Sequence, residues 1–179
     1  MVLVAEIQDI EDKYRGKTLN ESQRHLLSSK LGLWPWVPNE IKEIWEEKIL
    51  CFLELFSFLE TKDEFPTDDI KLLVAAEACL LICKRDFSDY RFLRSIHVWE
   101  DQIPRQPGAH GMASMHEVHL SWEYLKKTIG NGSDGQNLVL HEFAHVIDFS
   151  DDGKAQSIPV PKTSKDYEFW EGLVSDMHA

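Results

Sequence analysis

The chain has 179 residues, of which 43% are hydrophobic and 11% aromatic. This suits one globular domain, which at this length buries about two thirds of the surface of the unfolded chain. The 19 basic residues against 31 acidic ones give a formal net charge of -12. Such a surface repels phosphate groups, so we exclude nucleic acid and anionic membranes as partners.

The cysteines and apolar segments predict a cytoplasmic protein. Cys79 and Cys83 lie in an apolar helical pattern, and we expect them, like Cys51, to be buried free thiols, which indicates a reducing compartment. The N-terminus lacks the basic region and apolar core of a signal peptide. The longest apolar stretch, Leu72 to Cys83, is too short to cross a bilayer.

The first half of the chain reads as helical. Residues 1–30 are polar and charged, and we expect a loosely ordered N-terminal arm or a short helix there. WPWVP (34–38) predicts a rigid apolar turn. Asn39 is then expected to cap a helix that runs from Glu40 to about Glu60, because apolar residues recur at helical spacing. A second helix, apolar on all sides, is predicted from Asp68 to about Lys84.

The second half adds strands. Residues 94–100 (RSIHVWE) and 115–122 (MHEVHLSW) alternate as strands do, with a loop over 101–114 between them. A polar turn leads to a helix that begins near Asn137, and a last helix is predicted from about residue 165. The order helix, helix, strand, strand, helix, helix indicates an α+β fold, with residues 31–179 as its domain.

The stretch NLVLHEFAHVID (137–148) carries the chemistry. His141 and His145 lie one helical turn apart, so both imidazoles can bind one tetrahedral zinc ion. Glu142, beside the first ligand, can act as general base on a zinc-bound water that attacks a peptide carbonyl. The alternative is a helix that contains two histidines by chance, which is an odd choice on an apolar helix without a metal.

These residues resemble the Mlc titration factor A family of zinc-dependent peptidases. HEFAHVID (141–148) matches that family's active-site helix, and WPWVP, AAEACLLIC (75–83), HVW (97–99), LSW (120–122) and DGQN (134–137) extend the likeness over about residues 31–175. The resemblance implies a zincin core of the gluzincin type, with N-terminal helices, a small mixed sheet and an HExxH active-site helix. It also implies an aminopeptidase-like activity.

Further roles follow only from the resemblance. In such a core an edge strand beside the active-site helix pairs with the backbone of the substrate, so His119, Leu120 and Ser121 become substrate-strand candidates. Asp148, on the same helical face as His145, could orient an imidazole or could simply be a polar residue near the helix end. The family name implies a transcriptional repressor as a partner.

The third zinc ligand is the main departure from the family. Its members take this ligand from a glutamate in an NPxEFFA-like motif on a later helix, and the sequence reaches Ala179 without that motif. Glu168 and Glu171 are weak substitutes, because solvated helix charges are the simpler explanation for both, and His178 is weaker still. Either the chain is a fragment of a longer enzyme, or two histidines hold the zinc together with waters or a borrowed ligand.

Three other residues have simpler explanations. His116 and His119 fit solvent-facing positions of a strand, although His119 could lie in a substrate groove. Glu77 interrupts the most apolar helix and fits a hydrogen-bonded core residue.

Two functions stay open: a zinc metallopeptidase that hydrolyses peptides or proteins, or an impaired family member that binds a transcriptional regulator.

Overall fold

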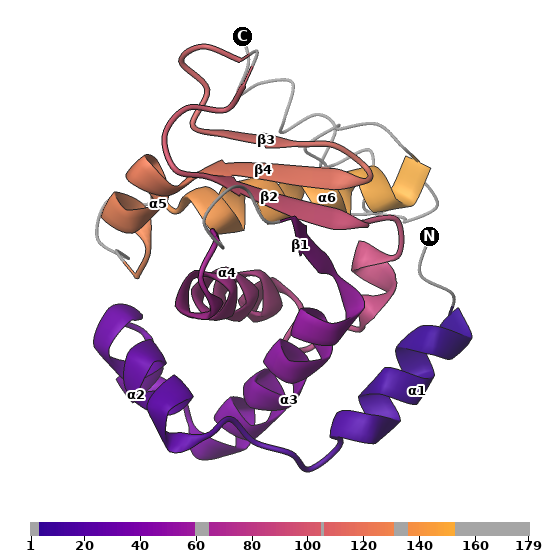
Figure 1. Cartoon of the computed structure of the whole chain (residues 1–179). Helices are drawn as coiled ribbons and strands as arrows, with labels where there is room; N and C mark the ends of the chain where they lie inside the picture. The colour runs from indigo at the N-terminus through magenta and orange to yellow at the C-terminus, as the bar shows by residue number, and fades with distance from the viewer. Residues whose placement is uncertain (1–3, 60–64, 105, 131–135, 153–179) are drawn as a thin grey trace, which may run out of the picture.

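The structure, a computed structural model, describes residues 4–59, 65–104, 106–130 and 136–152. This part of the chain forms an α+β fold of six α-helices and one four-stranded mixed sheet (Figure 1). The helices and two 3₁₀ turns are α1 (Val4–Tyr14), α2 (Glu21–Lys30), η1 (Trp34–Trp36), α3 (Asn39–Leu55), α4 (Asp68–Leu81), η3 (Phe87–Tyr90), α5 (Trp122–Thr128) and α6 (Leu138–Asp152). The strands are β1 (Ser57–Leu59), β2 (Ser95–Trp99), β3 (Gly111–Ala113) and β4 (Glu117–Ser121).

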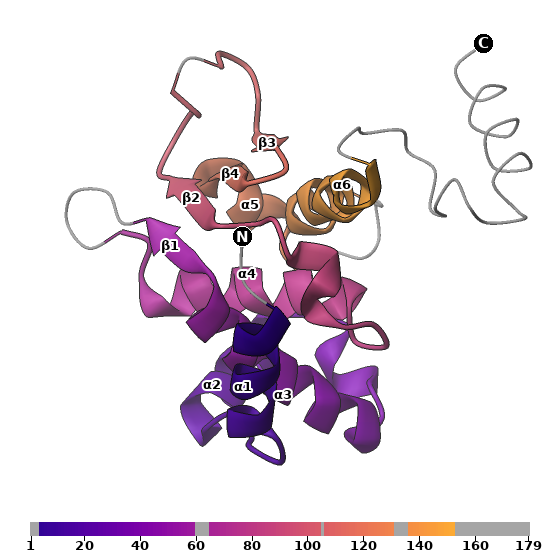
Figure 2. The same ribbon diagram turned by 90° about the vertical axis from the view of Figure 1, so that its right-hand side faces the viewer.

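The sheet has the strand order β1-β2-β4-β3. β1, β2 and β4 run parallel, whereas β3 is antiparallel to β4. Strands alternate their side chains between the two faces of a sheet, and here Ile96, Val98, Val118 and Leu120 are fully buried. They form the face that α4 and α6 cover, as the two views in Figures 1 and 2 show.

A second helical layer lies beyond α4. α3 packs on α4, α1 packs on α3, and α2 packs on α4. Aromatic rings fill the space between the layers: Phe52 lies 5.7 Å from Phe143 of α6 and 6.2 Å from Tyr90, measured between ring centroids. This apolar contact fixes which face of α6 turns inward.

The first 30 residues differ from the expected loose arm or short helix. Two helices form there, and both contribute to the core, since Ile7 and Leu27 are buried. α2 begins with a capping box in which the Asn20 side chain accepts from the Gln23 backbone and the Gln23 side chain accepts in return. The buried Glu46 of α3 accepts hydrogen bonds from the Leu19 backbone and from Arg24, which ties the segment to the domain.

Several element boundaries also differ from the sequence prediction. The first long helix begins at Asn39 with Pro38 at the cap position and ends at Leu55, because the chain then joins the sheet as β1. The expected loop over 101–114 contains β3, and Trp122 begins α5 instead of ending a strand. The strand over 95–99 and the helix from Asp68 are confirmed.

All three cysteines are free thiols, as expected: Cys51 and Cys79 are buried and Cys83 is half-buried. Burial raises the pKa of the Cys51 thiol to about 12 and that of Cys83 to about 11, so both stay protonated and unreactive at neutral pH. Within the described residues no helix has the length and apolar character that crossing a membrane requires.

Candidate metal centre on helix α6

α6 begins where the sequence predicts. Asn137 caps it, because its side-chain oxygen accepts a hydrogen bond of 2.9 Å from the backbone N–H of Leu140. The other end is held by Arg91, whose guanidinium donates to the backbone carbonyl of Ser150. Both ends of the motif-bearing helix are therefore anchored to the rest of the domain.

The Asn137 cap is itself positioned by Glu77 of α4. The Asn137 amide donates to Glu77 Oε1 at 2.6 Å, and the Gly130 backbone N–H donates to the same oxygen at 3.0 Å. Glu77 is 4% exposed, and among the described residues its Oε2 has no hydrogen-bond partner. Burial raises the pKa of Glu77, while the two donors lower it by less. The interpretation of Glu77 as a hydrogen-bonded core residue is confirmed.

His141 and His145 converge at one point on the outer side of α6. Their Nε2 atoms lie 3.3 Å apart, and their rings stand at 89° with centroids 4.7 Å apart. Two ligands of a tetrahedral zinc, each at about 2.05 Å, are separated by about 3.3 Å. The observed separation therefore matches that of two zinc ligands. Burial, followed by the charge of His141, lowers the pKa of His145, which favours the neutral imidazole that binds metals.

Glu142 points into a narrow space between α6 and strand β3. It is 5% exposed, and this burial raises the pKa of its carboxyl to about 7. A Cβ added at Gly111 of β3 would collide with Glu142 Oε1 and lie 2.7 Å from Leu138 Cδ1. Only glycine therefore leaves room for this carboxylate in its present place.

A cleft of about 380 Å³ opens beside these groups. His110 and Tyr124 stack along it with ring centroids 4.1 Å apart, and the Tyr124 hydroxyl donates to Gln136 at 3.0 Å. The lining residues come from β3, α5 and α6 and from the segments that precede β3 and α6: His110, Gly111, Tyr124, Gln136, Asn137, Leu138, His141 and Glu142. One histidine and the glutamate of the motif thus face a space large enough for part of a peptide.

A family model described as glucose-regulated metallo-peptidase M90, which is the Mlc titration factor A family, matches residues 7–179. The chain belongs to the M90 metallopeptidase family. It is also 26% identical over 164 residues to the uncharacterized protein slr2042 of Synechocystis sp., an alignment that covers 83% of this chain. The chain spans 59% of the length of that relative.

The M90 resemblance led us to expect β4 as the edge strand for substrate, and this is wrong. β4 pairs with β2 on one side and β3 on the other, so its backbone has no free edge. Leu120 is fully buried in the core, and Ser121 caps α5 by accepting from the Tyr124 backbone. His119 is half-buried on the face of the sheet that points away from α6. The strand at the edge beside α6 is β3.

The other predicted residues of the M90 site have mixed outcomes. Asp148 lies close enough to His145 to raise the pKa of that imidazole, a smaller effect than burial. His116 is half-buried, and its Nδ1 donates a hydrogen bond of 2.9 Å to the Phe92 carbonyl oxygen. Glu168, Glu171 and His178 lie outside the described residues.

Sequence reasoning missed His110, Gly111 and Tyr124. His110 and Gly111 fall in a segment that reads as a loop, and Tyr124 follows Trp122, which reads as the end of a strand. A three-residue strand gives too short an alternation to detect, so the sequence offered only Gly111 itself as a signal that a backbone passes close to another group.

Proposed function

We propose that this M90 protein is a zinc-dependent metallopeptidase with an aminopeptidase-like, gluzincin-type site. The observation that carries the proposal is the 3.3 Å separation between the Nε2 atoms of His141 and His145 beside the buried Glu142. These two imidazoles would hold the metal. Zinc supplies a Lewis acid that polarises a carbonyl and makes water acidic enough to react at neutral pH.

Glu142 is the general base of the proposed reaction. Its carboxylate lies at the cleft, one residue from the first ligand, where it can take a proton from the attacking water and return it to the leaving amine. The contact with Gly111 restricts where the carboxylate can move. Asp148 is proposed to orient His145, consistent with its electrostatic influence on that ring.

β3 is proposed to bind the substrate backbone. The Ser121 N–H donates to the His110 carbonyl, and the Ser114 N–H donates to the Glu117 carbonyl. Hydrogen-bonded pairs alternate along an antiparallel ladder, so the backbone groups of Gly111 and Ala113 point away from β4. An extended peptide that adds to this edge would pass directly beside Glu142.

Two protein ligands leave room for a third, and Glu168 and Glu171 remain predictions for that role. A protein substrate and a transcriptional regulator as partner remain proposals that follow from the family resemblance. A cytoplasmic location remains a proposal that follows from the free cysteines and the short apolar segments.

Substitution Glu142→Gln tests the proposed chemistry. Removal of a general base lowers kcat/KM for peptide hydrolysis by about 10²- to 10⁴-fold, while the zinc content and melting temperature stay close to those of the original protein. Glu123→Gln, on the exposed side of α5, is the matched control and should retain activity. Full activity in Glu142→Gln would contradict the mechanism.

A further inference from the structure

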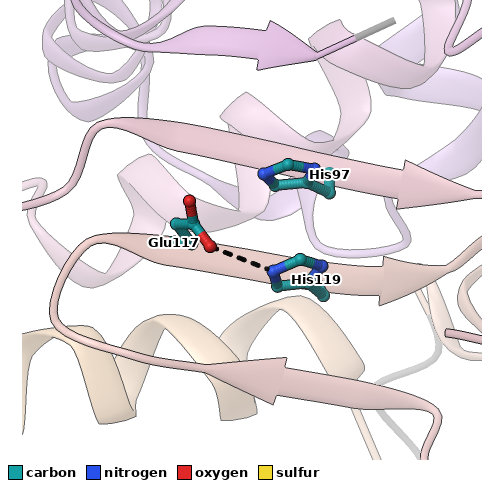
Figure 3. Close-up of side chains that lie close together, drawn as sticks. All are labelled: His97, Glu117 and His119. Atoms are coloured by element: carbon teal, nitrogen blue, oxygen red, sulfur yellow. Dashed lines mark hydrogen bonds and ion pairs between the residues drawn. The ribbon is translucent and has the colours of Figure 1, made fainter. Parts of the chain in front are cut away.

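A second group of metal-binding side chains lies on the other face of the sheet. His97 of β2 and His119 of β4 are paired in register, and Glu117 lies two residues before His119 on the same strand. Their neighbours Ile96, Val118 and Leu120 point to the opposite face, toward the helices, and are fully buried. Figure 3 shows the three side chains on the near face of β2 and β4, with helix behind the strands.

The three side chains lie close to one another. One ligand atom from each of His97, Glu117 and His119 lies within 4.8 Å of the others, and His119 Nε2 is 3.5 Å from Glu117 Oε2. The two imidazoles stack with centroids 4.3 Å apart and planes 10° apart. Glu117 is half exposed, whereas only 14% of the His119 side chain is exposed, so a solvated ion can approach from the carboxylate side.

We propose that His97, Glu117 and His119 form a second metal site, separate from α6, for a divalent transition-metal ion such as Zn²⁺. Two imidazoles and one carboxylate are a ligand set that suits zinc and its neighbours in the first transition row. Mg²⁺ and Ca²⁺ prefer oxygen ligands and are disfavoured here.

Metal binding requires a small local rearrangement. A metal lies in the plane of each imidazole that binds it, so the two stacked rings must tilt toward each other. The ligand atoms must also close from within 4.8 Å to about 3.3 Å. The side chain of Glu117, on the exposed edge of the group, can follow this closure by rotation about its χ angles.

Trp99 competes with the metal for His119. Its indole Nε1 donates to His119 Nδ1 at 3.2 Å, so in the neutral imidazole the proton resides on Nε2, the atom that faces Glu117. Ligation through Nε2 moves that proton to Nδ1 and breaks the bond from Trp99. The indole therefore weakens metal binding, and its removal should strengthen it.

The site would link β2 to β4 across the sheet. A metal that binds the folded chain and not the unfolded one stabilises the fold in proportion to the logarithm of its concentration. This predicts a structural or regulatory metal that does not take part in hydrolysis at α6. This site shares no residue with the proposed peptidase site on α6, so it can bind metal whether or not the protein hydrolyses peptides.

The test uses the full chain with His141→Ala and His145→Ala, which removes the α6 pair. Titration calorimetry with Zn²⁺ should show one remaining equivalent, and Mg²⁺ should show none. Adding His97→Ala or His119→Ala should weaken zinc binding by more than about tenfold, whereas His25→Ala, exposed on α2, should not change it. Zero equivalents in the double variant, or an equivalent that survives both strand substitutions, would overturn the proposal.

Two further variants protect the test against misfolding. Glu117→Gln changes an exposed side chain conservatively and should weaken binding. Trp99→Phe should tighten it by about fivefold, the worth of one hydrogen bond. A damaged fold cannot produce tighter binding, so unchanged or weaker zinc affinity in Trp99→Phe would contradict the assigned site.

Discussion

The two histidine pairs, one on α6 and one on the face of the sheet that points away from α6, differ in how the backbone presents them. His141 and His145 project from successive turns of one helix, and their rings meet at 89° with nitrogens 3.3 Å apart. His97 and His119 come from neighbouring parallel strands, and their rings stack at 10°. A helix turn lets two ring nitrogens converge, whereas strand register places two rings side by side.

This difference separates a preorganised site from one that must rearrange. The two nitrogens of the α6 pair already lie at the separation of two zinc ligands, so little binding energy is needed to bring them together. The strand pair must lose a ring stack and the Trp99 hydrogen bond first. We therefore expect zinc to fill the α6 pair at lower concentration than the strand pair.

Replacing one histidine of each pair with alanine should give the largest difference in the rate of peptide hydrolysis. His145→Ala removes a proposed ligand, so peptide hydrolysis should fall to the level of the buffer. His97→Ala, on the far face of the sheet, should change hydrolysis by no more than about twofold. Initial rates on an unblocked peptide in zinc-replete buffer measure both. Equal losses in the two variants would remove the distinction between the pairs.

Gly111→Ala tests whether β3 shapes the site at α6. The added Cβ meets the flexible end of Glu142, so the fold should persist while the carboxylate is displaced. Misplacement of a catalytic group by about 1 Å can cost about 10²-fold in rate, measured as kcat/KM.

A double variant shows whether that loss acts through the carboxylate. Gly111→Ala combined with Glu142→Gln should be no slower than Glu142→Gln alone, because the two changes remove the same contribution. Additive losses would mean that Gly111 acts by another route, such as substrate pairing along β3.

Asn137→Ala tests the anchoring that keeps the α6 pair convergent. It removes the helix cap and one of two donors to the buried Glu77. We expect a loss of about 2 kcal/mol in the free energy of unfolding and weaker zinc binding at α6. Denaturant titration and calorimetry measure these effects.

Asn20→Ala is the matched control, since Asn20 caps α2 on the far side of the domain. It should lower stability by about 1 kcal/mol with no change in zinc affinity. If both cap variants weakened zinc binding equally, the effect would be general destabilisation.

Glu77→Gln should have the smallest effect, on the pH dependence of stability. The folded pKa of Glu77 is raised, chiefly by burial, so the protonated form is favoured in the fold. Its contribution to stability is fully present below the unfolded pKa and is lost as pH rises through the folded pKa. Between mildly acidic and neutral pH, the free energy of unfolding of the variant should therefore fall by less than that of the original protein. An unchanged slope would show that Glu77 does not titrate in this range.

Local signals in the sequence predicted the local part of the site. The i, i+4 spacing of His141 and His145 and the cap at Asn137 depend only on helix geometry, and both are found in the structure. The capping box at Asn20 and Gln23 was also visible in the sequence, and it could have predicted α2.

Pairing between distant segments could not be predicted in this way. The position of β4 inside the sheet depends on β3, a three-residue strand in a segment that contains glycine and proline. The same holds for β1, where the chain leaves an apolar helix pattern to pair with β2. The stack of His97 and His119 depends on strand register, which no local pattern fixes.

The most direct test of the central claim is the position of zinc. Anomalous diffraction at the zinc absorption edge, from crystals grown with zinc, should show a peak about 2.1 Å from Nε2 of both His141 and His145. A zinc-replete crystal with no peak between these two imidazoles would contradict the proposed metal centre.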